Sequence, residues 1–255
     1  MKQPTEGVVS SDPVTDEIPS GLEIMLALLA TVVASSDLLV LSAGVAPSGL
    51  EQLHSCCSAL APLSHREHPR LRLMLREPEL DRQQIKWLVQ ELGPLFAPGG
   101  LLLHERCMGA RELATAYGLG LHLRSTSDWE AERSCFRGPL GVSAHHKADV
   151  LRARACGMQW AFVSPVCQPA SKPRDARPHL GEQYVLRLQH DHPEIDIYAL
   201  GGISPEVAAR LVARGGRGVV VLGGVFRGGA STSPQQARDA VVSYLSSMAS
   251  CSEEV

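Results

Sequence analysis

The sequence lacks several signals that would place it in common functional classes. Its 255 residues carry 24 Lys and Arg against 27 Asp and Glu, so there is no basic excess for nucleic acid or another polyanion. Its seven cysteines form no C-x-x-C pair, and their odd number argues against a closed set of disulfides. We therefore expect reduced thiols and a cytoplasmic protein with no nucleic-acid partner.

A long apolar run is also missing. The one candidate, residues 22–34, is interrupted by Glu23, follows an acidic leader and is shorter than the roughly 20 residues that a membrane span needs. We expect no signal peptide and no membrane anchor, and interpret the run as an extra N-terminal helix against the fold. Residues 1–20 are polar, contain three prolines and are predicted to be a loose, flexible arm.

Short apolar runs alternate with segments of helical periodicity from residue 37 onward. The runs that read as buried strands are 37–42, 71–75, 101–103, 120–123, 140–142, 160–163, 195–200 and 219–222. The segments that read as helices are 49–60, 81–92, 110–117, 148–156, 184–190, 205–213 and 234–248. Strands that alternate with helices predict an α/β fold with a parallel sheet. A single (β/α)8 barrel over residues 21–250 fits the length, and a doubly wound open sheet is the alternative.

Two glycine pairs follow the last two predicted strands, Gly201-Gly202 after the seventh and Gly223-Gly224 after the eighth. Glycines let backbone N–H groups approach an anion closely, and barrels frequently bind phosphate with these two loops. We therefore predict a small molecule that carries a phosphate; the alternative is that both pairs only form turns. Neither pair belongs to a P-loop or a G-x-G-x-x-G fingerprint.

Polar side chains gather where the other strands end, which is where barrels carry out their chemistry. The candidate substrate-binding residues are Arg76 after the second strand, His104 and Glu105 after the third, Ser143 after the fifth and Lys172 in the loop after the sixth. The two cations suit a phosphate or a pyrophosphate. His104 and Glu105 have no clear third partner, so the sequence predicts no zinc site.

The stretch from residue 138 to 173 carries a family resemblance. With G-V-S-A-H at 141–145, S-P at 164–165 and S-K-P at 171–173, it resembles the thiamine phosphate synthase and TenI-like superfamily of (β/α)8 barrels. The likeness extends from about Leu38 to the final helix. It implies a thiamine-biosynthesis enzyme that acts on a thiazole phosphate, with His145 catalytic and the phosphate on Lys172 and the glycine loops. Without it, His145 would read as a hydrogen-bonded residue of the barrel wall.

Departures from the synthase pattern favour one branch of the superfamily. Synthases place a magnesium-binding aspartate after the third strand and another in H-x-G-Q-x-D after the fourth; here Glu105 and Ser127 stand there. Magnesium prefers carboxylate oxygens, and a serine offers only a hydroxyl. The resemblance therefore favours the TenI-like branch: a thiazole tautomerase, an isomerase with no metal or other cofactor, in which His145 is the acid and base.

Two alternatives stay open. The first is a thiamine phosphate synthase, a transferase that joins a pyrimidine diphosphate to a thiazole phosphate, with Mg²⁺ held by Glu105 and Asp128. The second is a non-catalytic regulatory barrel that binds a phosphate ligand. Pairing of two copies through the outer helices is compatible with the sequence.

Overall fold

The computed structural model describes residues 37–42, 49–66, 71–168, 178–226 and 232–250. The arm predicted for residues 1–20, the helix predicted for 22–34 and the loop residue Lys172 lie outside these ranges. Within them, no helix is long and apolar enough to cross a membrane.

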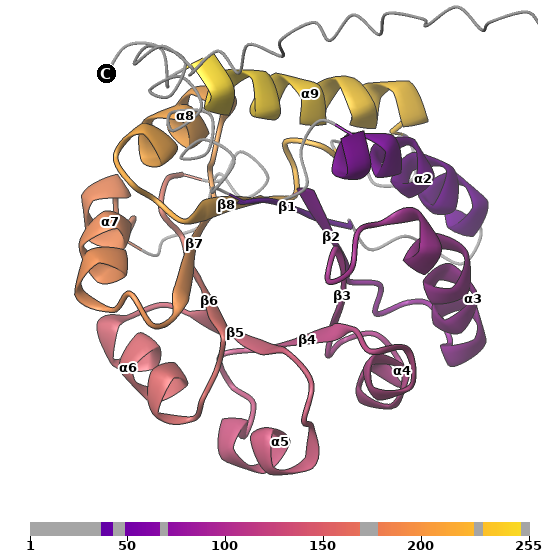
Figure 1. The fold of residues 1–255 in the computed structure, drawn as a ribbon, viewed down its shortest axis with the longest axis horizontal. Coiled ribbons are helices and arrows are strands. Elements are labelled where there is room, and N and C mark those ends of the chain that lie inside the picture. The colour runs from indigo at the N-terminus through magenta and orange to yellow at the C-terminus, as the bar shows by residue number, and fades with distance from the viewer. Residues whose placement is uncertain (1–36, 43–48, 67–70, 169–177, 227–231, 251–255) are drawn as a thin grey trace, which may run out of the picture.

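Eight parallel strands close into a barrel in chain order, and helices surround it (Figure 1). The strands are β1 Asp37–Leu41, β2 Leu71–Leu75, β3 Leu101–His104, β4 Gly120–Leu123, β5 Leu140–Ala144, β6 Trp160–Val163, β7 Asp196–Leu200 and β8 Gly218–Val221. The barrel closes because β1 pairs with β8 as well as with β2, with Leu38 opposite both Val219 and Leu71. The (β/α)8 prediction is therefore confirmed, and the open sheet is excluded.

The helices follow the strands in turn. They are α2 Leu50–Arg66, α3 Arg82–Leu92, α4 Ala110–Tyr117, α5 Trp129–Cys135, α6 Lys147–Ala155, α7 Glu182–Asp191, α8 Pro205–Ala213 and α9 Pro234–Ser250, with a 3₁₀ turn at Gly93–Leu95. The sequence did not predict α5, because it is short and polar and buries only Trp129. It begins at Asp128, whose carboxylate accepts a hydrogen bond from the Ala131 amide at 3.1 Å.

The first described helix is longer than predicted. The sequence predicts a helix only to residue 60, but α2 continues through Pro62 to Arg66. Leu63 and Ser64 are buried, and the Ser64 hydroxyl donates to the Leu71 carbonyl at 3.1 Å. Burial of this last turn against β2 offsets the free-energy cost of the backbone hydrogen bond that is lost at a proline inside a helix.

Side chains alternate along each strand, so the core has two parts. One set of side chains faces the helices, and the other fills the barrel interior. The interior cluster consists of Leu39, Leu41, Met74, Leu102, Trp160, Phe162, Tyr198 and Val220.

The Trp160 indole occupies space inside the barrel that two glycines leave open. Gly141 pairs with Trp160 across β5 and β6, and a Cβ atom there would lie 2.0 Å from the Trp160 Nε1. A Cβ atom at Gly120 in β4 would lie 3.0 Å from the same ring and 2.4 Å from Leu102. Both strand positions must therefore be glycine to leave room for the indole.

We expect Gly141→Ala to lower the free energy of unfolding by about 1–3 kcal/mol, because the added methyl overpacks the barrel interior. Urea unfolding followed by circular dichroism measures the change. The control is Gly93→Ala, because a Cβ atom there meets nothing within 4 Å and the backbone is already helical. Combining Gly141→Ala with Trp160→Leu should recover part of the loss; equal stability of the two alanine variants would contradict this explanation.

Candidate active site

A hydrogen-bonded row runs inside the barrel from Trp160, the first residue of β6, through His122 of β4 to Ser143 near the end of β5. The Trp160 Nε1 lies 3.1 Å from the His122 Nδ1, and the His122 Nε2 lies 3.0 Å from the Ser143 Oγ. An indole N–H can only donate, so Nδ1 of His122 accepts and the ring hydrogen lies on Nε2, which donates to Ser143. The Ser143 hydroxyl hydrogen is left to donate to a ligand.

His122 is held neutral in this row. Its ring is 1% exposed and stacks on Phe162 with the centroids 4.1 Å apart. Burial, and then the neighbouring His104, lower the pKa of His122 well below its usual value. His122 is therefore a core residue with hydrogen-bond partners on both ring nitrogens.

His145 follows β5, two residues after Ser143. Its backbone amide donates to the Asp149 carboxylate at 2.7 Å, and its Nδ1 lies 2.7 Å from the Ser164 carbonyl oxygen. A carbonyl can only accept, so Nδ1 carries the hydrogen. In the neutral imidazole, Nε2 therefore holds the lone pair and can accept a proton.

Glu105 after β3 is locked to residues that follow β4. Its Oε1 accepts hydrogen bonds from the Arg124 amide at 3.1 Å and from the Arg124 Nε, and the Ser127 hydroxyl lies 2.8 and 2.7 Å from its two carboxylate oxygens. Burial alone would raise the pKa of Glu105, but the hydrogen bonds from Ser127 and Arg124 and the Arg124 charge lower it. Glu105 is therefore an ionised carboxylate whose Oε1 is held by Arg124.

His104, the residue before Glu105, points into the barrel. Its side chain is 6% exposed, and its Nδ1 accepts a hydrogen bond from the Arg106 amide at 3.1 Å. Burial, and next the positive charge of Arg76, lower the pKa of His104 to about 4. His104 is thus a neutral imidazole at pH 7, with its hydrogen on Nε2.

These residues do not fit a magnesium site. Oε1 of Glu105 is held by Arg124, and the single hydroxyl hydrogen of Ser127 is shared between the two oxygens of Glu105. Asp128, the expected substitute ligand, caps α5. No group of three or more His, Cys, Asp or Glu side chains that could hold a metal occurs in the described part of the chain. Magnesium here would have to displace the Arg124 guanidinium from Oε1 of Glu105, and Ser127 supplies a hydroxyl where a second carboxylate ligand is expected.

The predicted phosphate loops follow β7 and β8 and are joined by one tyrosine. Gly201 and Gly202 have φ angles of +96° and +67°, and a Cβ atom at Gly202 would lie 2.5 Å from the Gln168 carbonyl oxygen. Tyr244 of α9 donates to the Ile203 carbonyl at 2.7 Å and fills the space where a Gly224 side chain would stand. The glycines thus have a packing role, and their phosphate-binding role stays a prediction.

The structure places most of the predicted site residues at one end of the barrel. Arg76, His104, Glu105, Ser143 and His145 lie at the ends of β2, β3 and β5, and the glycine loops follow β7 and β8 at the same end. Sequence reasoning missed Arg124 as a partner of Glu105. The available signal was an acidic residue and a basic residue directly after two consecutive strands.

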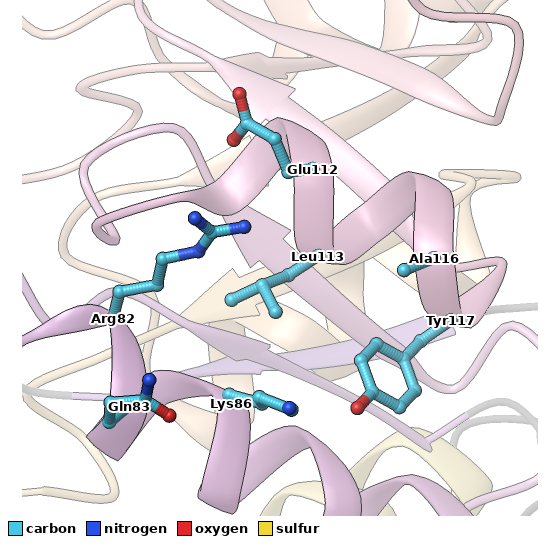
Figure 2. A pocket seen from close by; sticks show the side chains of 7 residues that line it. All are labelled: Arg82, Gln83, Lys86, Glu112, Leu113, Ala116 and Tyr117. Atoms are coloured by element: carbon cyan, nitrogen blue, oxygen red, sulfur yellow. The ribbon is translucent and has the colours of Figure 1, made fainter.

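Two surface cavities lie outside the barrel. The larger, about 490 Å³, is a groove between α3 and α4 lined by Arg82, Gln83, Lys86, Glu112, Leu113, Ala116 and Tyr117 (Figure 2). It contains none of the predicted site residues. The smaller, about 260 Å³, adjoins the site, because Glu105 and Arg124 are among its lining residues.

Comparison with known proteins identifies the family. The family model described as thiamine monophosphate synthase matches residues 72–225. The chain belongs to this family. It is 31% identical over 169 residues to a thiamine-phosphate synthase of Herpetosiphon aurantiacus, covering 65% of this chain and 78% of the relative. It is 30% identical over 108 residues to that of Bacillus velezensis, covering 42% of this chain and about half of the relative, 48%.

Solved structures support the same fold. A thiamine phosphate pyrophosphorylase from Pyrococcus furiosus has a TM-score of 0.59 and 18% identity, covering 88% of this chain and 98% of that one. A structure described as native KDPGal has a TM-score of 0.63 and 13% identity, covering 85% and 96%. At such identities these structures show the barrel alone. The family membership inferred from the V-S-A-H segment is confirmed by the sequence match.

We expect acid to destabilise this family member partly through His104. Its pKa is lowered from 6.5 to about 4 in the folded chain. As the pH falls below 6.5 the unfolded chain binds a proton that the folded chain does not, so stability is lost until the pH reaches about 4. At about 1.4 kcal/mol per tenfold change in proton affinity, the full loss is about 3 kcal/mol.

Urea unfolding at neutral pH and at about pH 5 measures this loss. His104→Asn keeps an oxygen that can accept the Arg106 amide but has no ionisable ring, so it should lose less stability than the unmodified chain. His146→Asn, at an exposed histidine, should leave the acid sensitivity unchanged. Equal acid sensitivity of the His104 variant and the unmodified chain would rule out this role.

Proposed function

We propose that this chain is a metal-independent thiazole tautomerase, an isomerase that converts a carboxythiazole phosphate into its aromatic tautomer. The observation that carries the proposal is the hydrogen bond between His145 Nδ1 and the Ser164 carbonyl at 2.7 Å. It fixes the tautomer of a partly exposed imidazole at the end of β5, so that Nε2 is the proton acceptor.

The reaction needs a single base that returns its proton. His145 Nε2 takes the proton from the ring carbon, and the electron pair of that C–H bond moves into the ring. The exocyclic double bond then takes the proton back from Nε2 at its outer carbon, which completes the aromatic thiazole. No redox partner or leaving group is involved, and an imidazole suits both proton transfers near neutral pH.

Other residues bind the substrate in this proposal. The Ser143 hydroxyl has a hydrogen to donate, because His122 already donates to its oxygen. The loops at Gly201-Gly202 and Gly223-Gly224 hold the phosphate together with Lys172. Small substrates with a phosphate commonly use these two loops in barrels.

The synthase alternative is favoured by the names of the relatives, which are thiamine-phosphate synthases. Its chemistry needs Mg²⁺ to neutralise a departing pyrophosphate. The engaged carboxylate of Glu105 and the helix-capping role of Asp128 argue against a magnesium site. The proposal therefore gives the tautomerase priority over the synthase.

We expect His145→Asn to lower kcat for tautomerisation by about 10²- to 10⁴-fold, because the general base is removed. Proton NMR of the thiazole product, in buffer that contains EDTA, measures the rate. The affinity for the thiazole phosphate, measured by isothermal titration, should stay within about threefold, which is below 1 kcal/mol. The matched control is His146→Asn, which changes the adjacent, exposed histidine and should leave the rate unchanged.

The same titrations separate the alternatives. Binding of the pyrimidine diphosphate only when Mg²⁺ is present, with no tautomerisation, would replace the tautomerase by the synthase. Tight binding of the thiazole phosphate, with no turnover in the unmodified chain, would favour the non-catalytic barrel.

A further inference from the structure

Three arginines follow the consecutive strands β2, β3 and β4, at the same end of the barrel as His145. Arg76 comes directly after β2, Arg106 lies two residues after β3, and Arg124 comes directly after β4. The ends of these strands lie side by side, because Leu75 of β2 pairs with Leu103 of β3 and His104 of β3 pairs with His122 of β4. The charges of all three arginines act on His104 at the middle strand. Burial, and next the Arg106 charge, lower the pKa of the Arg76 guanidinium, as expected where cations face one another.

Acidic residues offset this charge only in part. Glu105 is paired with Arg124, and the buried Glu77 acts on Arg76. His104 remains neutral at pH 7 and adds no charge. Among the charged groups that act on His104 and Arg76, three arginines therefore stand against two carboxylates, an excess of one positive charge that favours an anion.

Arg124 is held by its backbone amide and its Nε, which leaves the two terminal nitrogens of the guanidinium available to bind a ligand. Its amide and Nε bind Glu105, and its carbonyl accepts a hydrogen bond from the Trp129 indole at 2.9 Å. Its side chain is 55% exposed, and its two terminal nitrogens have no hydrogen-bond partner within the described ranges. A guanidinium with free terminal N–H groups matches the two oxygens of a carboxylate or a phosphate.

We propose that Arg124 takes the place that a divalent metal occupies in a synthase site, and that with Arg76 and Arg106 it forms a metal-free subsite for an anionic group of the ligand. Glu105 and Ser127 stand where the two metal-binding carboxylates are expected; Glu105 binds the arginine instead of a metal, and Ser127 donates to Glu105. The subsite accepts a carboxylate or a phosphate. This inference does not depend on the tautomerase proposal.

The first probe is inorganic pyrophosphate, titrated into the unmodified chain in EDTA and again with Mg²⁺. We expect the same affinity in both buffers. Arg124→Gln should weaken binding by about ten- to hundredfold, the cost of a lost charge-assisted hydrogen bond. Arg106→Gln, which leaves the Glu105 pair intact, should also weaken it and serves if the Arg124 variant does not fold.

The matched control is Arg154→Gln in the last turn of α6. Arg154 is 49% exposed and pairs with Glu194 at 2.9 Å, so the variant removes the same charge from a similar ion pair. It lies at the opposite end of the barrel, where the helices finish, and should leave the affinity unchanged. An equal loss in the Arg124 and Arg154 variants would overturn the proposal, as would pyrophosphate binding that requires Mg²⁺.

Two further ligands identify the group that the subsite binds. If the subsite binds a carboxylate, Arg124→Gln should weaken the binding of carboxythiazole phosphate more than the binding of the thiazole phosphate that lacks the carboxylate. If the subsite binds a phosphate, the binding of both ligands should weaken equally. An unchanged affinity for both ligands and for pyrophosphate would overturn the proposal. If the chain binds pyrophosphate through Arg124 but does not tautomerise the thiazole phosphate, the subsite proposal stands and the proposed function is refuted.

Discussion

The Trp160 indole inside the barrel is the contact on which the fifth strand's active end depends. Gly120 and Gly141 have no side chains, so the ring fits between β4 and β5, and its N–H then reaches His122. That one donor decides the tautomer of His122, and the tautomer decides that Ser143 receives a hydrogen bond and keeps its own hydrogen for a ligand. The packing of Trp160 in the barrel interior thereby determines how the Ser143 hydroxyl is oriented near the end of β5.

A second constraint acts on the neighbouring strand ends, where charge decides the arrangement. His104 stays neutral because it is buried among arginines, and Glu105 stays ionised because Ser127 and Arg124 donate to it. The two adjacent residues therefore differ in role: the histidine supplies an uncharged polar surface, and the carboxylate fixes the direction of a guanidinium. In the proposed function, His145 at the end of β5 transfers the proton, and the ends of β2 to β4 bind the anion, so the two roles use different strands of the same barrel end.

The strands were predictable because both faces of a parallel barrel strand are buried, which leaves continuous apolar runs such as Leu38–Leu41 and Trp160–Val163 in the sequence. Helix α5 was not, because a short polar helix capped by Asp128 has no apolar periodicity to reveal it. The last turn of α2, beyond residue 60, was not predicted, because tertiary burial outweighs the local effect of Pro62. The position of Ser127 was visible in the sequence, but its bond to Glu105 depends on how β3 and β4 lie side by side.

The proposed exchange of a metal for an arginine also bears on which reaction such a barrel can support. Departure of a pyrophosphate builds negative charge on the leaving group, and a divalent ion can follow that charge because it binds the leaving oxygens directly. A guanidinium tied to Glu105 carries one charge, already shared with a carboxylate, and cannot move with a leaving group. It suits an anion whose charge stays constant through the reaction, as it does when only a proton moves from one carbon to another. The fixed cation at the end of β4 and the single base at the end of β5 are therefore consistent with the same chemistry.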